Sequence, residues 1–199
     1  IYKVGESEKQ LRKDCIENLD TAIEKFELAL QEEPEHEHII EQLAVAYLNR
    51  ASIEENESIK SNWLNKSIQM YDQVISSPVK HQSDTSKVNS SIFLAMIFGK
   101  LKKLEEASRL INIIICCQPK YFLGYYAKAC IYALNGKDMD SLLKIAFSAL
   151  KKAIELNSAI EKEMLWDPDL KNLSSSSVYK DWFSSFYQNE LKSKEENQK

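Results

Sequence analysis

A spacing of small and apolar residues recurs along the chain and predicts helices. A small residue is followed by a bulky apolar residue four positions later and by another apolar residue seven positions later. Proline stands twelve positions after the small residue. Two sets of residues fit this spacing in full, Ala22/Phe26/Ala29/Pro34 and Ala107/Ile111/Ile114/Pro119. The first three positions share one helical face, and proline at the fourth follows the end of the helix. Weaker copies are Ser67/Tyr71/Val74, with Pro78 one place early, and Ala146/Leu150/Ala153, with Ser158 at the proline position.

A second pattern precedes three of these copies and predicts a partner helix for each. A small residue stands three places before an aromatic one in Leu43-Ala44 with Tyr47, Leu94-Ala95 with Phe98, and Ala129 with Tyr132. The small residue lets a neighbouring helix approach closely, and the ring fills the space beside it. Glycine and proline are scarce and apolar alternation is absent, so the sequence predicts an all-α fold.

Together the two patterns resemble the tetratricopeptide repeat, a helix–turn–helix unit of about 34 residues. The third unit fits best, with Leu94, Ala95, Phe98, Ala107, Ile111, Ile114 and Pro119 at the family's spacing. The resemblance implies a right-handed superhelical solenoid of antiparallel helix pairs, with about 8–10 helices.

The organisation of the chain follows from the same patterns. We expect an N-terminal helix with a degenerate first unit in residues 1–20, a tetratricopeptide-like array in residues 21–158, a capping segment in residues 159–191 and a disordered tail in residues 192–199. The second unit contains an extra stretch, Ala51 to Asn62, without Gly or Pro. This composition favours extension of both helices, with a break near Ser58, Asn62 or Asn65, and a loop is the alternative.

The C-terminal segment is rich in large apolar side chains. Its Asp167-Pro168-Asp169-Leu170 sequence resembles the closing segment of many tetratricopeptide arrays. Trp166, Leu170, Leu173, Trp182, Phe183 and Phe186 are available to cover the apolar face of the last unit. The alternative for the aromatic rings is an exposed ligand site. For the serine run from Ser174 to Ser177 we expect a linker or a helix cap.

Charge and apolar runs bear on partners and location. Residues 1–60 carry 15 acidic and 7 basic side chains, against 15 acidic and 19 basic in residues 61–199. Without a concentrated basic face we expect no nucleic-acid binding. The longest apolar run, Leu110 to Cys117, is shorter than the roughly 18 residues that a bilayer requires, so we expect no membrane insertion.

The cysteines and histidines give no clear metal site. Cys116 and Cys117 lack the spacing of a zinc site, and we expect them to be buried thiols of an apolar helix. Reduced thiols favour a cytoplasmic or nuclear location. His36 and His38 stand two apart, which on a helix points them in different directions, so we expect a turn leading into the next helix.

Catalytic motifs are missing from the sequence. It contains no phosphate-binding glycine loop, no Gly-x-Ser-x-Gly, no His-Glu-x-x-His and no Cys-x-x-Cys. We therefore expect neither an enzyme nor a cofactor.

The resemblance implies that the first helix of each pair lines a concave groove for a protein or peptide partner. By spacing, the residues of this candidate groove are His38, Glu41, Val45, Leu48, Asn49, Asn89, Ile92, Met96, Gly99, Lys100, Leu123, Tyr126, Cys130, Ala133 and Leu134. The alternative is that they pack against a neighbouring helix or against the C-terminal segment folded back into the groove.

Some family members bind chaperone C-termini through a carboxylate clamp of basic residues. The corresponding positions here, Glu41, Val45, Phe93, Leu123 and Ala127, include no basic residue, so we expect no such clamp. The function that follows is a non-catalytic protein–protein interaction module or scaffold. The alternatives are a self-associating, homo-oligomeric subunit of an assembly and a regulatory domain of a larger protein.

Overall fold

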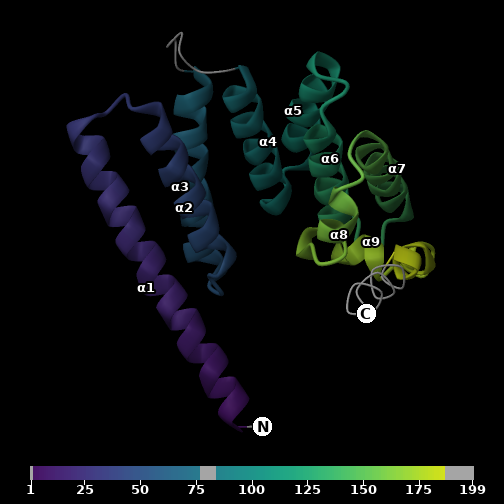
Figure 1. The fold of residues 1–199 in the computed structure, drawn as a ribbon, viewed down its shortest axis with the longest axis horizontal. Coiled ribbons are helices and arrows are strands. Elements are labelled where there is room, and N and C mark those ends of the chain that lie inside the picture. The colour runs from purple at the N-terminus through teal and green to yellow at the C-terminus, as the bar shows by residue number, and fades with distance from the viewer. Residues whose placement is uncertain (1, 77–83, 187–199) are drawn as a thin grey trace, which may run out of the picture. The chain divides into compact units, whose positions relative to one another are not determined.

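The structure is a computed structural model that describes residues 2–76 and 84–186 (Figure 1). These residues form only helices and connecting turns, which confirms the all-α prediction for them. The elements in chain order are α1 (Tyr2–Glu32), α2 (Glu37–Ser52), α3 (Glu57–Ser76), α4 (Asp84–Lys100), α5 (Leu104–Cys117), α6 (Phe122–Asn135), α7 (Asp140–Leu156), α8 (Ile160–Met164), the 3-10 helix η1 (Pro168–Leu170) and α9 (Lys171–Ser174). Residues 180–186 are also helical. The superhelical solenoid stays a prediction.

The chain divides into two compact units, residues 1–90 and residues 91–199. The division falls inside α4. Helix α1 continues through residue 20 without a break. The predicted disordered tail, residues 192–199, lies outside the described residues.

The recurrent spacing predicts the buried stripe of three helices correctly. Less than a tenth of each residue is exposed in Ser67/Tyr71/Val74 of α3, Ala107/Ile111/Ile114 of α5 and Ala146/Leu150/Ala153 of α7. In α1 the equivalent residues are only half-buried, and the neighbouring Ile23 is the one that enters the core. Helix α1 packs chiefly on α2 and meets α3 through the ion pair of Glu27 with Lys66, so a narrower stripe of α1 is covered.

The predicted helix ends are also confirmed for two of the proline positions. Helix α1 ends at Glu32, before Pro34, and α5 ends at Cys117, before Pro119. His36 precedes α2, where its Nδ1 accepts a hydrogen bond from the backbone N–H of Ile39. A turn leading into a helix was predicted at this place.

The extra stretch of the second unit is mostly helical, as predicted, but the break lies earlier than expected. Helix α2 ends at Ser52 and α3 begins at Glu57, so residues 53–56 form the turn. Asn56 explains the start of α3, because its side-chain oxygen accepts from the backbone N–H groups of Ser58 and Ile59. Two helices of 16 and 20 residues result.

A charged residue of the first unit, Arg50 of α2, joins α1 to the end of α2. Its guanidinium donates to Asp20 at 2.9 Å and to Glu54 at 3.0 Å and lies 5.5 Å from the centre of the Trp63 ring. Only 8% of Arg50 is exposed. The backbone N–H of Asn56 and the Arg50 guanidinium lower the pKa of Glu54. A nearly buried cation is thus paired with two carboxylates.

Replacing Arg50 by Ala should destabilise the first unit by about 2–3 kcal/mol, because hydrogen bonds to a charged group and contact with a ring are lost together. Denaturant unfolding followed by circular dichroism measures the loss. Arg12→Ala is the matched control, since Arg12 pairs with the exposed Glu55 and should cost less than about 1 kcal/mol. Equal losses in the two variants would show that burial does not strengthen the Arg50 pairs.

In the second unit, α6, α7 and the C-terminal segment build an apolar core cluster. Leu170 and Leu173 are fully buried beside Leu150 of α7, and Phe183 is 5% exposed in the same cluster. Trp182 and Phe186 pack against it. Trp166 differs from this set, because 65% of its surface is exposed. Five of the six predicted capping side chains therefore lie on the core.

The serine run begins at Ser174, the last residue of α9, and leads to the last described helical turns. The side chain of Ser176 accepts from the backbone N–H of Val178 at 3.3 Å, and its carbonyl accepts from the N–H of Lys180. This confirms the predicted helix cap.

Candidate functional site

The candidate groove of the second unit is occupied by the chain's own C-terminal segment. Asp167, directly before η1, accepts a hydrogen bond from the Tyr126 hydroxyl at 2.7 Å. It also accepts a hydrogen bond from the Cys130 thiol, at 3.7 Å. Both partners lie on α6, one turn apart, on the face that the resemblance assigned to a ligand. Of the two arrangements considered from the sequence, a ligand groove or a C-terminal segment folded back onto these residues, the structure has the second.

A second carboxylate extends the contact to the end of α4. Lys100 donates to both oxygens of Asp169, at 2.7 and 2.6 Å, and about a quarter of its side chain is exposed. The backbone N–H of Asp169 in turn donates to Asp167, at 2.8 Å. Pro168 follows Asp167 at the first position of η1. In this turn the carboxylate of Asp169 contacts α4, and that of Asp167 contacts α6.

Apolar contacts and an amide complete this docking. Leu170 is fully buried in the core cluster, against which Met96 and Tyr126 also pack. The side-chain amide of Asn172 donates to the backbone oxygen of Ala133 at 3.0 Å. The segment is therefore fixed on α6 by ionic, polar and apolar contacts at once.

Burial sets the ionisation of the two α6 side chains under Asp167. Desolvation raises the pKa of the Tyr126 hydroxyl, and the neighbouring Cys130 and the hydrogen bond to Asp167 add to it. Desolvation also raises the pKa of the Cys130 thiol, with the Asp167 charge acting in the same direction. Both groups are therefore protonated at neutral pH, and Cys130 is not an activated nucleophile.

The remaining candidate groove residues fall into two groups by unit. In the first unit His38 and Asn49 are exposed, while Glu41, Val45, Leu48 and Asn89 are half-buried. In the second unit Ile92, Gly99, Cys130 and Ala133 are buried, while Met96, Lys100, Leu123, Tyr126 and Leu134 are half-buried. A ligand cannot reach the Cys130 side chain in this arrangement, since none of its surface is exposed.

One residue of the first unit's group, Glu41, takes part in a contact within its own unit. The Ser90 hydroxyl of α4 donates to Glu41 of α2 at 3.3 Å. Val45 and Leu48 continue the same face of α2, one and two turns further on. This face of α2 therefore combines a half-buried carboxylate, Glu41, with the half-buried apolar side chains of Val45 and Leu48.

Two of the cysteines correct the sequence interpretation. Cys116 and Cys117 are exposed, as is Cys15, and only Cys130 is buried. The buried stripe of α5 runs through Ile111 and Ile114, and the last two residues of the helix turn away from it. The prediction of buried thiols was wrong for this pair.

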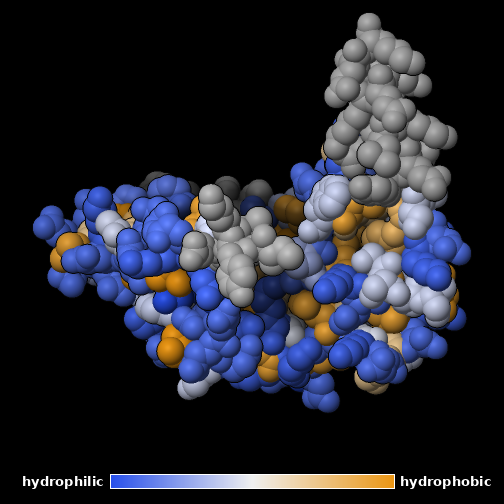
Figure 2. Space-filling view, turned by 90° about the horizontal axis from the view of Figure 1, so that it is seen from below, coloured by the Kyte–Doolittle hydropathy of each residue, from blue (hydrophilic) through white to orange (hydrophobic). Residues whose placement is uncertain are grey.

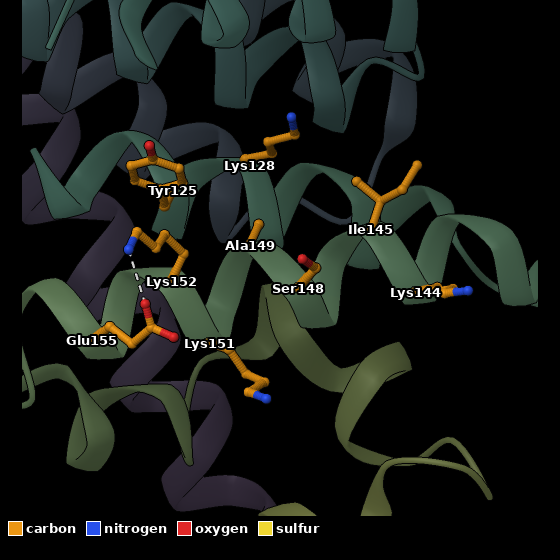
Figure 3. A pocket seen from close by; sticks show the side chains of 9 residues that line it. All are labelled: Tyr125, Lys128, Lys144, Ile145, Ser148, Ala149, Lys151, Lys152 and Glu155. Atoms are coloured by element: carbon orange, nitrogen blue, oxygen red, sulfur yellow. Dashed lines mark hydrogen bonds and ion pairs between the residues drawn. The ribbon is translucent and has the colours of Figure 1, made fainter. Parts of the chain in front are cut away.

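A lysine-lined hollow on α6 and α7 was not predicted. It has a volume of about 720 Å³ and is lined by Tyr125, Lys128, Lys144, Ile145, Ser148, Ala149, Lys151, Lys152 and Glu155 (Figure 3). The sequence alone could have indicated this hollow, since α7 carries lysines at positions 144, 151 and 152, about two helical turns apart. Charge totals over residues 1–60 and 61–199 do not reveal this local cluster of lysines.

Hydrophilic side chains predominate on the face shown in Figure 2, and apolar side chains appear in smaller patches. Within residues 2–76 and 84–186, no helix is long and apolar enough to cross a membrane. Over the same residues, no group of three or more His, Cys, Asp and Glu side chains is placed to hold a metal ion.

No protein-family model matches this chain, and no curated protein sequence matches it. The likeness to the tetratricopeptide repeat therefore stands on the spacing of the residues given above.

Proposed function

We propose that this protein is a non-catalytic interaction module whose helix faces bind polypeptide segments of partner proteins. The proposal rests chiefly on the docking of the Asp167–Leu170 turn onto α6. There, first-helix positions bind two carboxylates and a leucine of an irregular segment, through Lys100, Tyr126 and the neighbouring core. A helix face that binds such a segment within the chain has the chemistry to bind one from a partner.

The face proposed for the partner is the one on α2. Glu41 and Val45 stand in α2 at the spacing at which Tyr126 and Cys130 stand in α6, and His38 and Asn49 extend the face in both directions. On α6 these positions are covered by η1, whereas on α2 they keep exposed surface. The resemblance to tetratricopeptide arrays, with their right-handed stacking of helix pairs, supports the same assignment.

Val45→Glu should abolish partner capture and leave the fold intact. A charge on a half-exposed helix face costs little until a partner must cover it, so the melting temperature should change by no more than a few degrees. Ile59→Glu is the matched control, because Ile59 lies on α3 of the same unit and is 46% exposed.

The measurement compares proteins captured from a cell lysate by the immobilised wild type and both variants, quantified by mass spectrometry. Proteins retained by the wild type and by Ile59→Glu but lost from Val45→Glu support the proposal. If all three chains retain the same proteins, the α2 face does not bind a partner.

A further inference from the structure

The lysine-lined hollow on α6 and α7 offers a second surface, on a different face of α6 from Tyr126 and Cys130. We propose that it binds a short acidic protein segment that carries apolar side chains between its carboxylates. The proposal does not depend on the α2 face, because every residue that lines the hollow lies in the second unit.

The cations of the hollow outnumber its anions. Lys128, Lys144, Lys151 and Lys152 line it, against the single carboxylate of Glu155. Only Lys152 is held by that carboxylate, at 2.9 Å, as the dashed line in Figure 3 marks. The hollow therefore attracts a ligand with several negative charges.

The partners of the other lysines leave their charges available. Lys128 of α6 donates to the neutral side chain of Asn112 at 2.9 Å. Lys151 lies over the ring of Phe147, 5.8 Å from its centre. In the part of the chain that the structure describes, no ion pair holds Lys144. The ammonium groups of Lys128 and Lys144 can each form a charge-assisted hydrogen bond with an arriving carboxylate.

The floor between the lysines is apolar. Figure 3 shows the Tyr125 ring of α6 beside Lys152 of α7, and Ala149 and Ile145 of α7 line the same hollow. Tyr125 is fixed by its hydroxyl, which donates to the backbone oxygen of Pro119 at 3.2 Å. Ile145 keeps 38% of its surface exposed, and Ala149 keeps 6%. An occupant gains most by placing an apolar side chain on this floor and acidic ones at the lysines.

The size and chemistry of the hollow favour a peptide over other anionic ligands. A volume of about 720 Å³ is that of a small-ligand or short-peptide site. No arginine lines it, so it lacks the planar fork that suits bidentate phosphate binding. One partly buried tyrosine does not make the row of stacking platforms that single-stranded nucleic acids use. The chain also binds its own acidic Asp167–Leu170 turn with a lysine, a tyrosine and an apolar neighbour.

The experiment uses the full chain and a short fluorescent peptide of alternating Glu and Leu, with fluorescence anisotropy as the readout. A matched peptide of alternating Gln and Leu tests the charge, and measurement at low and high salt tests its screening. The variant carries Lys128→Glu together with Lys144→Glu. Lys180→Glu is the control, because Lys180 is exposed and does not line the hollow. Thermal melts check that each variant is folded, and Lys144→Glu with Lys151→Glu replaces the first pair if it is not.

We expect the Glu peptide to bind the wild type and the Lys180→Glu control equally, with affinity that falls as salt is raised. The double charge reversal should weaken binding by roughly tenfold or more, since unlike charges become like charges at two points of contact. The Gln peptide should bind the wild type weakly. The proposal fails if the Glu peptide does not bind, if it binds the charge-reversed variant as well as the wild type, or if both peptides bind alike. It also fails if anionic vesicles or single-stranded DNA bind through these lysines while the peptide does not.

Discussion

Truncation of the chain after Asn157 should unfold the second unit. The deletion removes Met164, Leu170, Leu173 and Phe183, each of which is at most 5% exposed in the core cluster. Burial of one large apolar side chain contributes about 1.5–3 kcal/mol, so their joint loss is at least about 6 kcal/mol. A typical domain is stable by about 5–15 kcal/mol in total. The apolar faces of α6 and α7 would also be exposed, which favours aggregation.

Thermal unfolding and hydrogen exchange measure this effect. In the shortened chain the amides of α6 and α7 should exchange quickly, and the fraction of helix lost should exceed that of the deleted segment. Truncation after Leu191 is the control, because it removes only the tail that the sequence predicts to be disordered, and it should leave the melting temperature unchanged. A cooperative, monomeric truncation product with unchanged melting would contradict a structural role for the segment.

Met96→Glu should destabilise the second unit by about 2–4 kcal/mol, because it places a carboxylate against an apolar core. Met96 packs on the cluster that contains Leu170 and Cys130. The sequence left open whether Met96 belongs to a ligand groove or to a packed interface, and the two alternatives give opposite results for this variant. The structure favours the packed interface.

Met139→Glu provides the matched control for that measurement. Met139 precedes α7 and is 51% exposed, so the same substitution there should change the free energy of unfolding by no more than about 0.5 kcal/mol. Urea unfolding of both variants gives the two values. If the free energy of unfolding fell by a similarly small amount in both variants, Met96 would lie on an open surface.

The helices themselves were largely predictable from local spacing. Small and apolar residues at positions such as 107, 111 and 114 must share a face whatever surrounds the helix, and that face is buried in α3, α5 and α7. The turn at residues 53–56 was placed too late, although Asn56 followed by Glu57 is a recognisable helix start. Propensity alone had pointed to Ser58 and the later asparagines.

The candidate site depended on contacts between segments far apart in the sequence. Spacing assigned Lys100, Tyr126 and Cys130 to one face, yet it could not show that Asp167 and Asp169 reach them from residues far along the chain. Helix periodicity fixes which side a residue faces, and only tertiary contact decides what covers that side. The same limit explains Cys116 and Cys117, whose apolar helix led to a prediction of burial that the end of α5 does not provide.

The central claim, that the C-terminal segment covers the α6 face, can be measured with the chain's own thiols. Cys15, Cys116 and Cys117 are exposed and serve as internal references, while Cys130 is fully buried beside Asp167 with a raised pKa. The native protein is treated with a thiol reagent at neutral pH, and the labelled sites are read by mass spectrometry over time. We predict fast labelling of the three exposed cysteines and protection of Cys130 until the protein is unfolded. Labelling of Cys130 as fast as that of Cys116 and Cys117 would contradict the account.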